Sequence, residues 1–352
     1  MSVFIGFDGF IDTLITCVDT RTSPSSFRAI ATIREFATRV QQASGKSTNI
    51  ECSVQDQFLG GNAPLLAQTL IHLDIPVSLV GCCGYPSLSK EFSTLKKSDV
   101  YSFAQPGETE ALEFTDGKLL LGKMGEIGTI SLQEAFSRLP RNLIPDLLQQ
   151  SSVIATVNWT MMPLVGEFWH WMADHTQYLQ HKPFIFVDLC DPAKRTKTDL
   201  KKDLQALKRL NSIAPVILGL NRSEAEQTAR LFRLPTDTSL ASLAKRLATT
   251  LTLHAVIIHT RKEVAGARWK ESKISSESLK VPLCSHPKRA TGAGDNFNAG
   301  IILGLLEKKP LFEILNLAVA TSGIWVRTGN PAERPSLLTF LEKFKLSDDT
   351  SL

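Results

Sequence analysis

Near the end of the chain, a glycine-rich turn stands directly before a carboxylate. The stretch reads Ala290-Thr291-Gly292-Ala293-Gly294-Asp295, and an apolar segment follows it. Glycine lets the backbone approach a ligand closely, and the first amides of a helix, which lack partners within it, attract anions. A carboxylate beside such amides is placed to act as a general base while the amides hold a transferred group. The alternative is a simple glycine turn in which Asp295 only caps a helix.

The composition is that of an ordinary globular protein and excludes several classes of function. The chain has 352 residues, of which 43% are hydrophobic and 21% are charged. The net charge of +4 is spread along the chain, so we expect no nucleic-acid partner. No apolar run is long enough for a membrane span, and the first residues do not resemble a targeting signal. The six cysteines show no metal-binding spacing and indicate reduced thiols in a cytoplasmic protein.

Short apolar segments that alternate with helical patterns predict a parallel sheet covered on both faces. Ligands bind to such sheets beyond the carboxyl ends of the strands. Asp188, Asn221 and His259 each stand at the end of a predicted strand, so we expect them at one edge together with the turn at 292–295. The predicted strands cover residues 3–7, 77–80, 153–157, 184–188, 215–221 and 255–258.

A second, smaller sheet is predicted by a hairpin that interrupts this alternation. Asp116-Gly117 is a strong signal for a two-residue turn, and amphipathic segments flank it over residues 111–121. Asp12 stands in another apolar segment, where a lone aspartate is most often a turn or cap residue. Between these regions, apolar residues at helical spacing from Phe27 to Val40 predict a helix.

Several motifs, in this order along the chain, resemble those of the ribokinase-like (PfkB) carbohydrate kinase family. Gly60-Gly61-Asn62-Ala63, followed by the segment 80–84, resembles the N-terminal signature of that family. The stretch 290–300 resembles its C-terminal signature, and Asn221-Arg222-Ser223-Glu224 is similar to its Asn-x-x-Glu motif. Asp12 falls where family members carry a sugar-binding aspartate. The resemblance extends over nearly the whole chain.

The resemblance implies a Rossmann-like, three-layer α/β sandwich with a central, mostly parallel sheet and a small β-sheet lid. We therefore expect one kinase domain over residues 1–345, with the lid formed by segments near 8–18 and 98–124. Residues 346–352 are expected to be a frayed tail.

The resemblance also implies ATP-dependent phosphorylation of a hydroxyl group on a sugar or sugar-like molecule, assisted by Mg²⁺. It assigns the general base to Asp295 and the anion hole to Gly292, Ala293 and Gly294. It assigns acceptor contacts to Asp12, Gly60, Gly61 and Asn62. It assigns nucleotide contacts to Asn221, Glu224, Thr260, Arg261 and Thr291, with Glu224 and Asn221 organising Mg²⁺ through water.

Two departures from the family pattern keep other functions open. Arg289 stands where the family often has an acidic residue, and the loop 259–265 lacks the glycines that usually contact the nucleotide. A nucleoside kinase of the same family is one alternative, and a non-catalytic sugar or nucleotide sensor on a decayed kinase fold is another. A homodimer is a further expectation, because lid hairpins can pair across subunits.

Overall fold

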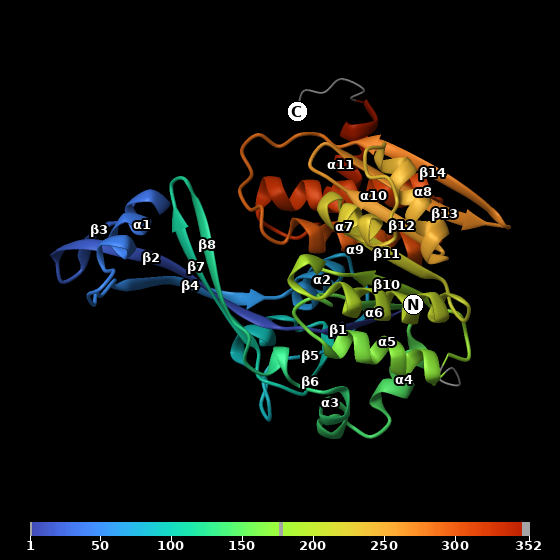
Figure 1. Ribbon diagram of the computed structural model, residues 1–352, viewed down its shortest axis with the longest axis horizontal. Coiled ribbons are helices and arrows are strands. Elements are labelled where there is room, and N and C mark those ends of the chain that lie inside the picture. Colours follow the sequence, from blue (N-terminus) through green and yellow to red (C-terminus); the bar gives the residue numbers. More distant parts are fainter. Residues whose placement is uncertain (1, 176–178, 347–352) are drawn as a thin grey trace.

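The computed structural model describes residues 2–175 and 179–346 of the chain (Figure 1). Within these residues, a nine-stranded sheet runs in the order β14-β13-β12-β11-β10-β9-β1-β5-β6. The strands from β12 to β6 are parallel, and β13 and β14 extend the sheet as antiparallel strands. Their bounds are β1 (Val3–Phe7), β5 (Val77–Gly81), β6 (Ser98–Ser102), β9 (Val153–Thr156), β10 (Phe184–Asp188), β11 (Val216–Asn221), β12 (Ala255–His259), β13 (Glu263–Lys270) and β14 (Lys273–Lys280).

Helices cover both faces of this sheet, and each face has its own apolar core. One face is covered by α3 (Leu132–Arg138), α4 (Leu143–Gln150), α5 (Leu164–Asp174), α6 (Lys197–Asn211), α7 (Arg222–Leu231) and α8 (Leu240–Leu251). The other face is covered by α2 (Asn62–His72), α9 (Ala293–Leu306), α10 (Leu311–Thr328) and α11 (Arg334–Leu346). The three-layer α/β architecture predicted from the sequence is therefore confirmed.

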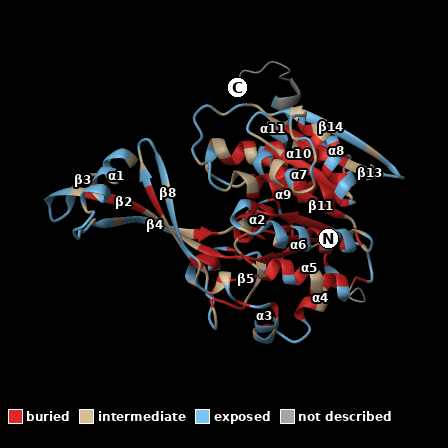
Figure 2. Cartoon of the chain, viewed as in Figure 1, coloured by how far each residue is buried: buried red, intermediate tan, exposed pale blue. Residues whose placement is uncertain are grey.

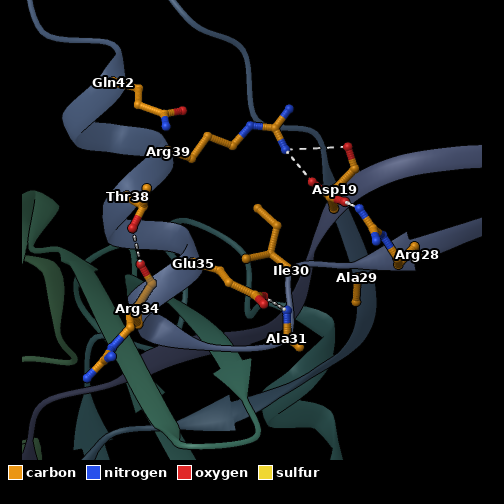
Figure 3. Close-up of a pocket in the computed structure, with 10 residues that line it drawn as sticks. All are labelled: Asp19, Arg28, Ala29, Ile30, Ala31, Arg34, Glu35, Thr38, Arg39 and Gln42. Atoms are coloured by element: carbon orange, nitrogen blue, oxygen red, sulfur yellow. Dashed lines mark hydrogen bonds and ion pairs between the residues drawn. The ribbon is translucent and has the colours of Figure 1, made fainter.

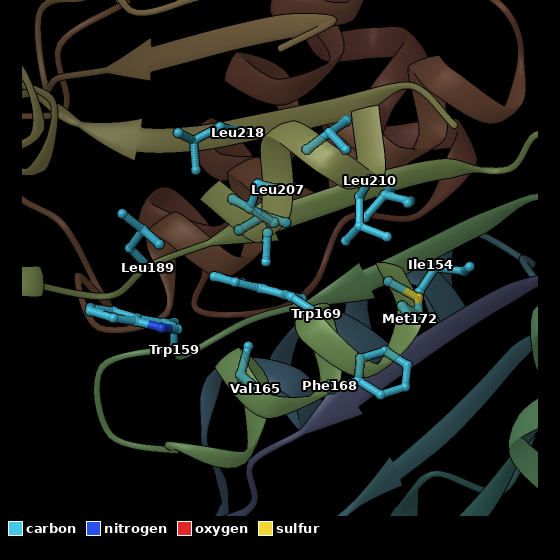
Figure 4. Close-up of a cluster of buried hydrophobic side chains, with 14 of the residues drawn as sticks. Ile154, Trp159, Val165, Phe168, Trp169, Met172, Leu189, Leu207, Leu210 and Leu218 are labelled. Carbon is cyan, nitrogen blue, oxygen red and sulfur yellow. The ribbon is translucent and has the colours of Figure 1, made fainter. Parts of the chain in front are cut away.

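The first core is built around the aromatic residues of α5. Figure 4 shows Trp169 facing Leu207 and Leu210 of α6, with Phe168 and Met172 on the same helix. All five side chains are fully buried, so the aromatic residues of α5 belong to the packed core. None of the helices in the described part of the chain is both long and apolar enough to cross a membrane.

The second sheet projects from this body, and we call it, with α1 (Ile33–Gln42), the lid (Figure 1). Its residues are mostly exposed, except for a small apolar cluster that includes Ile15, Ile30 and Leu112 (Figure 2). The lid meets the body at its buried base. Its strands are β2 (Phe10–Ser23), β3 (Ser26–Ala29), β4 (Cys52–Gly60), β7 (Gly107–Phe114) and β8 (Gly117–Lys123). Short 3₁₀ helices elsewhere are η1 (Lys90–Thr94), η2 (Gly125–Gly128) and η4 (Pro192–Lys194).

The structure differs from the sequence prediction in two parts of this region. Residues 98–102 were expected in the lid but form β6 at the edge of the main sheet, where they pair in parallel with β5. The helix expected from Phe27 is strand β3 at its start, and α1 begins only at Ile33. The helix begins there because Thr32 and Glu35 form a reciprocal capping box, which fixes the first turn. Of the expected tail, residue 346 ends α11, and 347–352 lie outside the described residues.

The contact between α9 and α10 gives a test of the packing that supports the site. A Cβ atom on Gly300 of α9 would lie 2.5 Å from the Ala318 Cα atom of α10. We expect Gly300→Ala to lower the free energy of unfolding by about 1–3 kcal/mol, because helix backbones must move apart. Urea unfolding measures this. Gly122→Ala is the control, since its Cβ would meet nothing within 4 Å, and equal losses in both variants would contradict the packing argument.

Candidate active site

The parallel strands bring a row of polar side chains to one edge of the main sheet. Asp8 directly follows β1, Asn158 follows β9, and Asp188, Asn221 and His259 end β10, β11 and β12. These five strands are neighbours in this order and run in the same direction, so their carboxyl ends meet at one edge. This is the edge at which parallel α/β sheets bind their ligands.

The glycine-rich turn at 292–295 opens α9 beside this row. Gly292 is the N-cap with φ +85°, a left-handed conformation that favours glycine. Asp295 lies in the first helical turn and is only 7% exposed. Burial, with the negative charges of Asp188 and Asp8, holds the pKa of Asp295 well above its ordinary value, and a hydrogen bond with the Asn62 side chain opposes this. The turn thus places one buried carboxyl group among others of the same charge.

Asp8 holds the Gly-Gly-Asn turn at the start of α2. Its carboxylate accepts hydrogen bonds from the backbone N–H groups of Asn62 and Ala63 at 2.9 and 2.7 Å. The Asn158 Nδ2 atom donates a third bond at 2.7 Å. A Cβ on Gly61, which has φ +93°, would lie 3.1 Å from Asp8 Oδ2, so glycine lets the turn close onto the carboxylate. The Asn158 Oδ1 atom is buried without a partner in the described residues.

Asp12 lies at the base of the lid, on β2, where lid and body meet. A Cβ on Gly60 of the neighbouring strand β4 would lie 2.4 Å from the Asp12 Cγ atom, so Gly60 makes the space that the carboxyl group occupies. Burial raises the pKa of Asp12, while a hydrogen bond from Thr109 and the charges of Arg289 and Lys118 lower it. Asp12, Gly60, Gly61 and Asn62 are therefore brought together beside the Asp8 carboxylate.

Asn221 and Glu224 form a reciprocal cap at the start of α7. Asn221 Oδ1 accepts from the Glu224 N–H at 3.0 Å, and Glu224 Oε2 accepts from the Asn221 N–H at 2.8 Å. Glu224 Oε1 also accepts from the Asp191 N–H at 2.9 Å. Both side chains thus already serve the fold, and each Glu224 oxygen has a further lone pair to offer a water molecule.

Asp188 stands beside Glu224 at the end of β10. Its Oδ2 atom accepts a hydrogen bond from the Nδ2 atom of Asn298 at 2.8 Å, and Asn298 lies on α9 about one turn after Asp295. Burial, with the negative charge of Glu224, raises the pKa of Asp188 to about 7. The Asn298 Oδ1 atom is buried and has no partner in the part of the chain that the structure describes.

The loop after β12 turns tightly without glycine. The Thr260 hydroxyl accepts from the N–H groups of Lys262 and Glu263 and donates to Glu263 O at 2.7 Å. No residue in 259–265 has a positive φ, so the turn needs no glycine. Arg261 is exposed and forms no ion pair with a carboxylate in the part of the chain that the structure describes. The His259 ring packs on the Phe297 ring, with the two ring centroids 4.8 Å apart. Burial lowers the pKa of His259 to about 4, so this side chain is neutral at physiological pH.

Two other features bear on where a ligand could sit. A hollow of about 790 Å³ lies on the lid between β3 and α1 (Figure 3), where Asp19 pairs with Arg28 and Arg39 and Glu35 accepts from the backbone N–H of Ala31. This hollow lacks the converging carboxylates of the sheet edge. Within residues 2–175 and 179–346, no three His, Cys, Asp or Glu side chains are arranged to hold a metal by themselves. The sheet edge is therefore the candidate site.

The sequence pattern of the prokaryotic ketohexokinase family matches residues 1–344. The chain belongs to this family. It is a carbohydrate kinase, an ATP-dependent phosphotransferase that acts on an alcohol group, and the resemblance to ribokinase-like kinases is confirmed. A protein of Haloferax volcanii named ketohexokinase is 26% identical over 353 aligned residues, which cover 96% of this chain and 90% of that protein.

Solved structures agree with this fold for the kinase. Ribokinase from Thermotoga maritima has a TM-score of 0.65 at 17% identity, covering 97% of this chain and 99% of that one. Arabidopsis thaliana ribokinase, solved with ribose and ATP, has a TM-score of 0.65 at 15% identity, covering 97% and 98%. At these identities the likeness establishes the ribokinase-like fold of the kinase, and the roles of single residues need separate arguments.

Sequence reasoning left three buried groups out of the kinase's candidate site, namely Asp8, Asn158 and Asn298. Asp8 follows a strand and precedes Gly9, which looks the same as an ordinary turn aspartate. Asn158 has φ +57°, a conformation that asparagine tolerates better than most residues. The sequence alone does not reveal this backbone angle. Asn298 stands three positions after Asp295, and that spacing on a helix was the one available signal.

The raised pKa of Asp188 predicts how stability depends on pH. Its folded-state pKa of about 7 lies above the ordinary 3.8, so the unfolded chain loses its proton first. Stability contributed by this group is present below pH 4 and is lost as pH rises to about 7. We expect Asp188→Asn to raise the melting temperature at pH 8 and to change it much less at pH 5, without nucleotide or divalent cations. Asp99→Asn, at an exposed position, is the control, and an equal effect at both pH values would contradict the assignment.

Proposed function

We propose that this kinase transfers the γ-phosphoryl group of ATP to a hydroxyl group of a ketohexose, with Asp295 as the general base. The observation that carries the proposal is the position of Asp295, buried in the first turn of α9 behind the left-handed Gly292. The name of the Haloferax volcanii relative supports a ketohexose as acceptor.

The proposed reaction moves one proton and one phosphoryl group. Asp295 takes the proton of the acceptor hydroxyl, and that oxygen forms a bond to the γ-phosphorus. The bond from the γ-phosphorus to the bridging oxygen breaks, and ADP leaves with its electron pair. The N-terminal amides of α9 at Gly292, Ala293 and Gly294 stabilise the charge on the transferred group. Asp295 later returns its proton to water.

The acceptor would lie between the lid and the body. Asp12 and the Asn62 side chain would bind hydroxyl groups of the sugar, and the backbone of Gly60 and Gly61 would contact it beside the two carboxyl groups for which these glycines leave space. The unpartnered Asn158 Oδ1 atom offers another acceptor beside Asp8. A buried polar atom without a partner costs stability, so a sugar hydroxyl that pairs with it would bind more tightly.

The donor set fits Mg²⁺ bound together with the nucleotide. Burial and mutual repulsion raise the pKa values of Asp188, Glu224, Asp295 and Asp8, and a bound cation would favour their ionised forms, including the one that Asp295 needs to act as a base. Mg²⁺ usually keeps several waters and takes few protein ligands beside phosphate oxygens. Glu224 and Asn221 would therefore hold it through water, and it would supply charge neutralisation at the phosphates. Thr260, Arg261 and Thr291 remain proposed nucleotide contacts from the loop after β12 and the start of α9.

The role of Asp295 can be tested by removing its basicity while keeping its shape. We expect Asp295→Asn to lower kcat by about 10²- to 10⁴-fold, the usual contribution of a general base. Sugar affinity, measured by calorimetry, should change little. Asp99→Asn serves as the surface control, and turnover of Asp295→Asn at the wild-type rate would refute the assignment.

A substrate panel tests the acceptor and separates the alternatives. ADP release would be measured with a ketohexose, an aldohexose, a pentose, a hexose phosphate and a nucleoside. We expect the ketohexose to give the highest kcat/KM. A preference for the nucleoside would favour a nucleoside kinase, and ligand binding without ADP release across the panel would favour a sensor.

Two further expectations stay predictions. The edge strand β8 of the lid exposes Leu120 and Leu121, at 56% and 50%, which supports pairing of two lids in a homodimer. The cytoplasmic location inferred from the reduced cysteines also stays a prediction.

A further inference from the structure

A planar cation joins the lid to the body at the edge of the candidate site. The guanidinium carbon of Arg289 lies 4.8 Å from the ring centroid of Phe58 on β4 of the lid. The same atom lies 4.7 Å from the Trp325 ring on α10 of the body. The described part of the chain offers this guanidinium no hydrogen bond or ion pair, so the two rings are what hold it. We call this arrangement the Phe58–Arg289–Trp325 stack.

On the lid side, the stack lies next to Asp12, the carboxylate that we propose contacts the sugar. Phe58 stands directly opposite Asp12 in the β2–β4 ladder, and opposed residues have their side chains on one face. Asp56, two residues before Phe58, shares that face. Burial lowers the pKa of Arg289, and the negative charges of Asp12 and Asp56, which lie close to it, oppose this. The pKa of Asp12 is also affected by Thr109 on β7, Lys118 on β8 and Asp8 at the base of the lid. Lys118 in turn forms an ion pair with Glu113 at 2.7 Å.

On the body side, the stack reaches the turn that carries the base. The Trp325 Nε1 atom donates to Thr291 O at 2.8 Å. The indole also lies 3.0 Å from the position that a Cβ on Gly292 would take. Trp325 is 1% exposed, so it is a rigid support. One indole therefore contacts both Arg289 and the Thr291-Gly292 turn.

We propose that Arg289 is a positioning residue that fixes the lid against the Gly292–Asp295 turn and so sets the place of Asp12 relative to Asp295. The proposal rests on the proposed role of Asp12 as an acceptor contact. Arg289 need not touch the sugar, because its planar group acts through Phe58 on one side and Trp325 on the other. An acidic residue could not stack between two electron-rich ring faces in this way.

Substitutions can separate two properties of Arg289, its positive charge and its planar guanidinium group. Lysine keeps the positive charge near Asp12 but lacks the planar group that fills the space between two rings. Methionine keeps much of the length but has neither property. We expect Arg289→Met to raise the KM for the sugar at least tenfold, with the KM for ATP within twofold of wild type. It should also move the acidic limb of the kcat/KM profile to higher pH, because Asp12 loses a cation that stabilises its charged form.

Arg289→Lys should restore the acidic limb of the pH profile but only part of the sugar KM. Phe58→Leu breaks the lid half of the stack while Arg289 stays, and it should raise the sugar KM without moving the pH profile. The control is Arg327→Met, because the Arg327 guanidinium lies over the Phe340 ring within the body, 5.4 Å from its centroid, and is held there also by hydrogen bonds to backbone oxygens. We expect the control to leave the sugar KM within twofold.

A readout independent of activity is amide hydrogen exchange of the full-length protein without ligands. Arg289→Met and Phe58→Leu should speed exchange in both β4 and residues 288–292, while Arg327→Met should not speed it in β4. Unchanged exchange in β4 and an unchanged sugar KM in both variants would overturn the proposal, as would full recovery of the KM by lysine. If Arg289→Met does not fold, Phe58→Leu decides the question by the same two measurements.

Asp12→Asn separates this proposal from the proposed function on which it rests. A raised sugar KM in Asp12→Asn, with no change in Arg289→Met or Phe58→Leu, would reject the stack alone. An unchanged sugar KM in Asp12→Asn would reject Asp12 as an acceptor contact, and with it this role for Arg289.

Discussion

Like charges buried together at one edge of the sheet are the constraint on which this site depends. Asp8, Asp188, Glu224 and Asp295 approach one another because four separate chain segments end or begin there. Removing carboxylates from water disfavours their ionised forms, and mutual repulsion adds to this cost. The fold compensates only in part, through backbone amides on Asp8 and Glu224 and the Asn298 amide on Asp188. These buried charges make the fold less stable than its packing would allow, and cationic or hydrogen-bonding ligands would recover that difference.

Close packing complements this electrostatic arrangement. Gly60 and Gly61 leave space that the carboxyl groups of Asp12 and Asp8 fill, and Gly292 takes a left-handed turn against Trp325. A side chain at any of these positions would displace either a carboxylate or an indole. Replacing one of these glycines would therefore move a carboxylate or an indole and also narrow the space for a ligand. A substitution cannot change one of these effects without the other.

The sequence predicted the body better than the lid, for a physical reason. Strands of the main sheet are buried on both faces, so β1, β9, β10 and β12 appear as continuous apolar runs. Strand β4 is largely exposed and polar, and it forms because β2 pairs with it, which a local pattern does not reveal. β3 was taken for part of a helix because Phe27 and Ile30 continue the helical spacing of Ile33 and Phe36, although β3 covers only Ser26–Ala29. Asp295 was predicted from its turn, whereas Asn158 was not, because its importance comes from a contact with Asp8 that spans 150 positions.

The way the lid joins the body has a consequence for how such an enzyme can change over time. β2 begins two residues after Asp8, and β4 ends at Gly60, immediately before the turn of α2. The carboxylate proposed to choose the sugar is thus carried by the lid, while the groups proposed to handle phosphate belong to the body. Selection can alter the lid, and hence the alcohol that is accepted, while the phosphoryl-transfer groups stay as they are. The cost of such divergence falls on the contacts that cross between the two parts, and the contact of Arg289 with Phe58 is one of them.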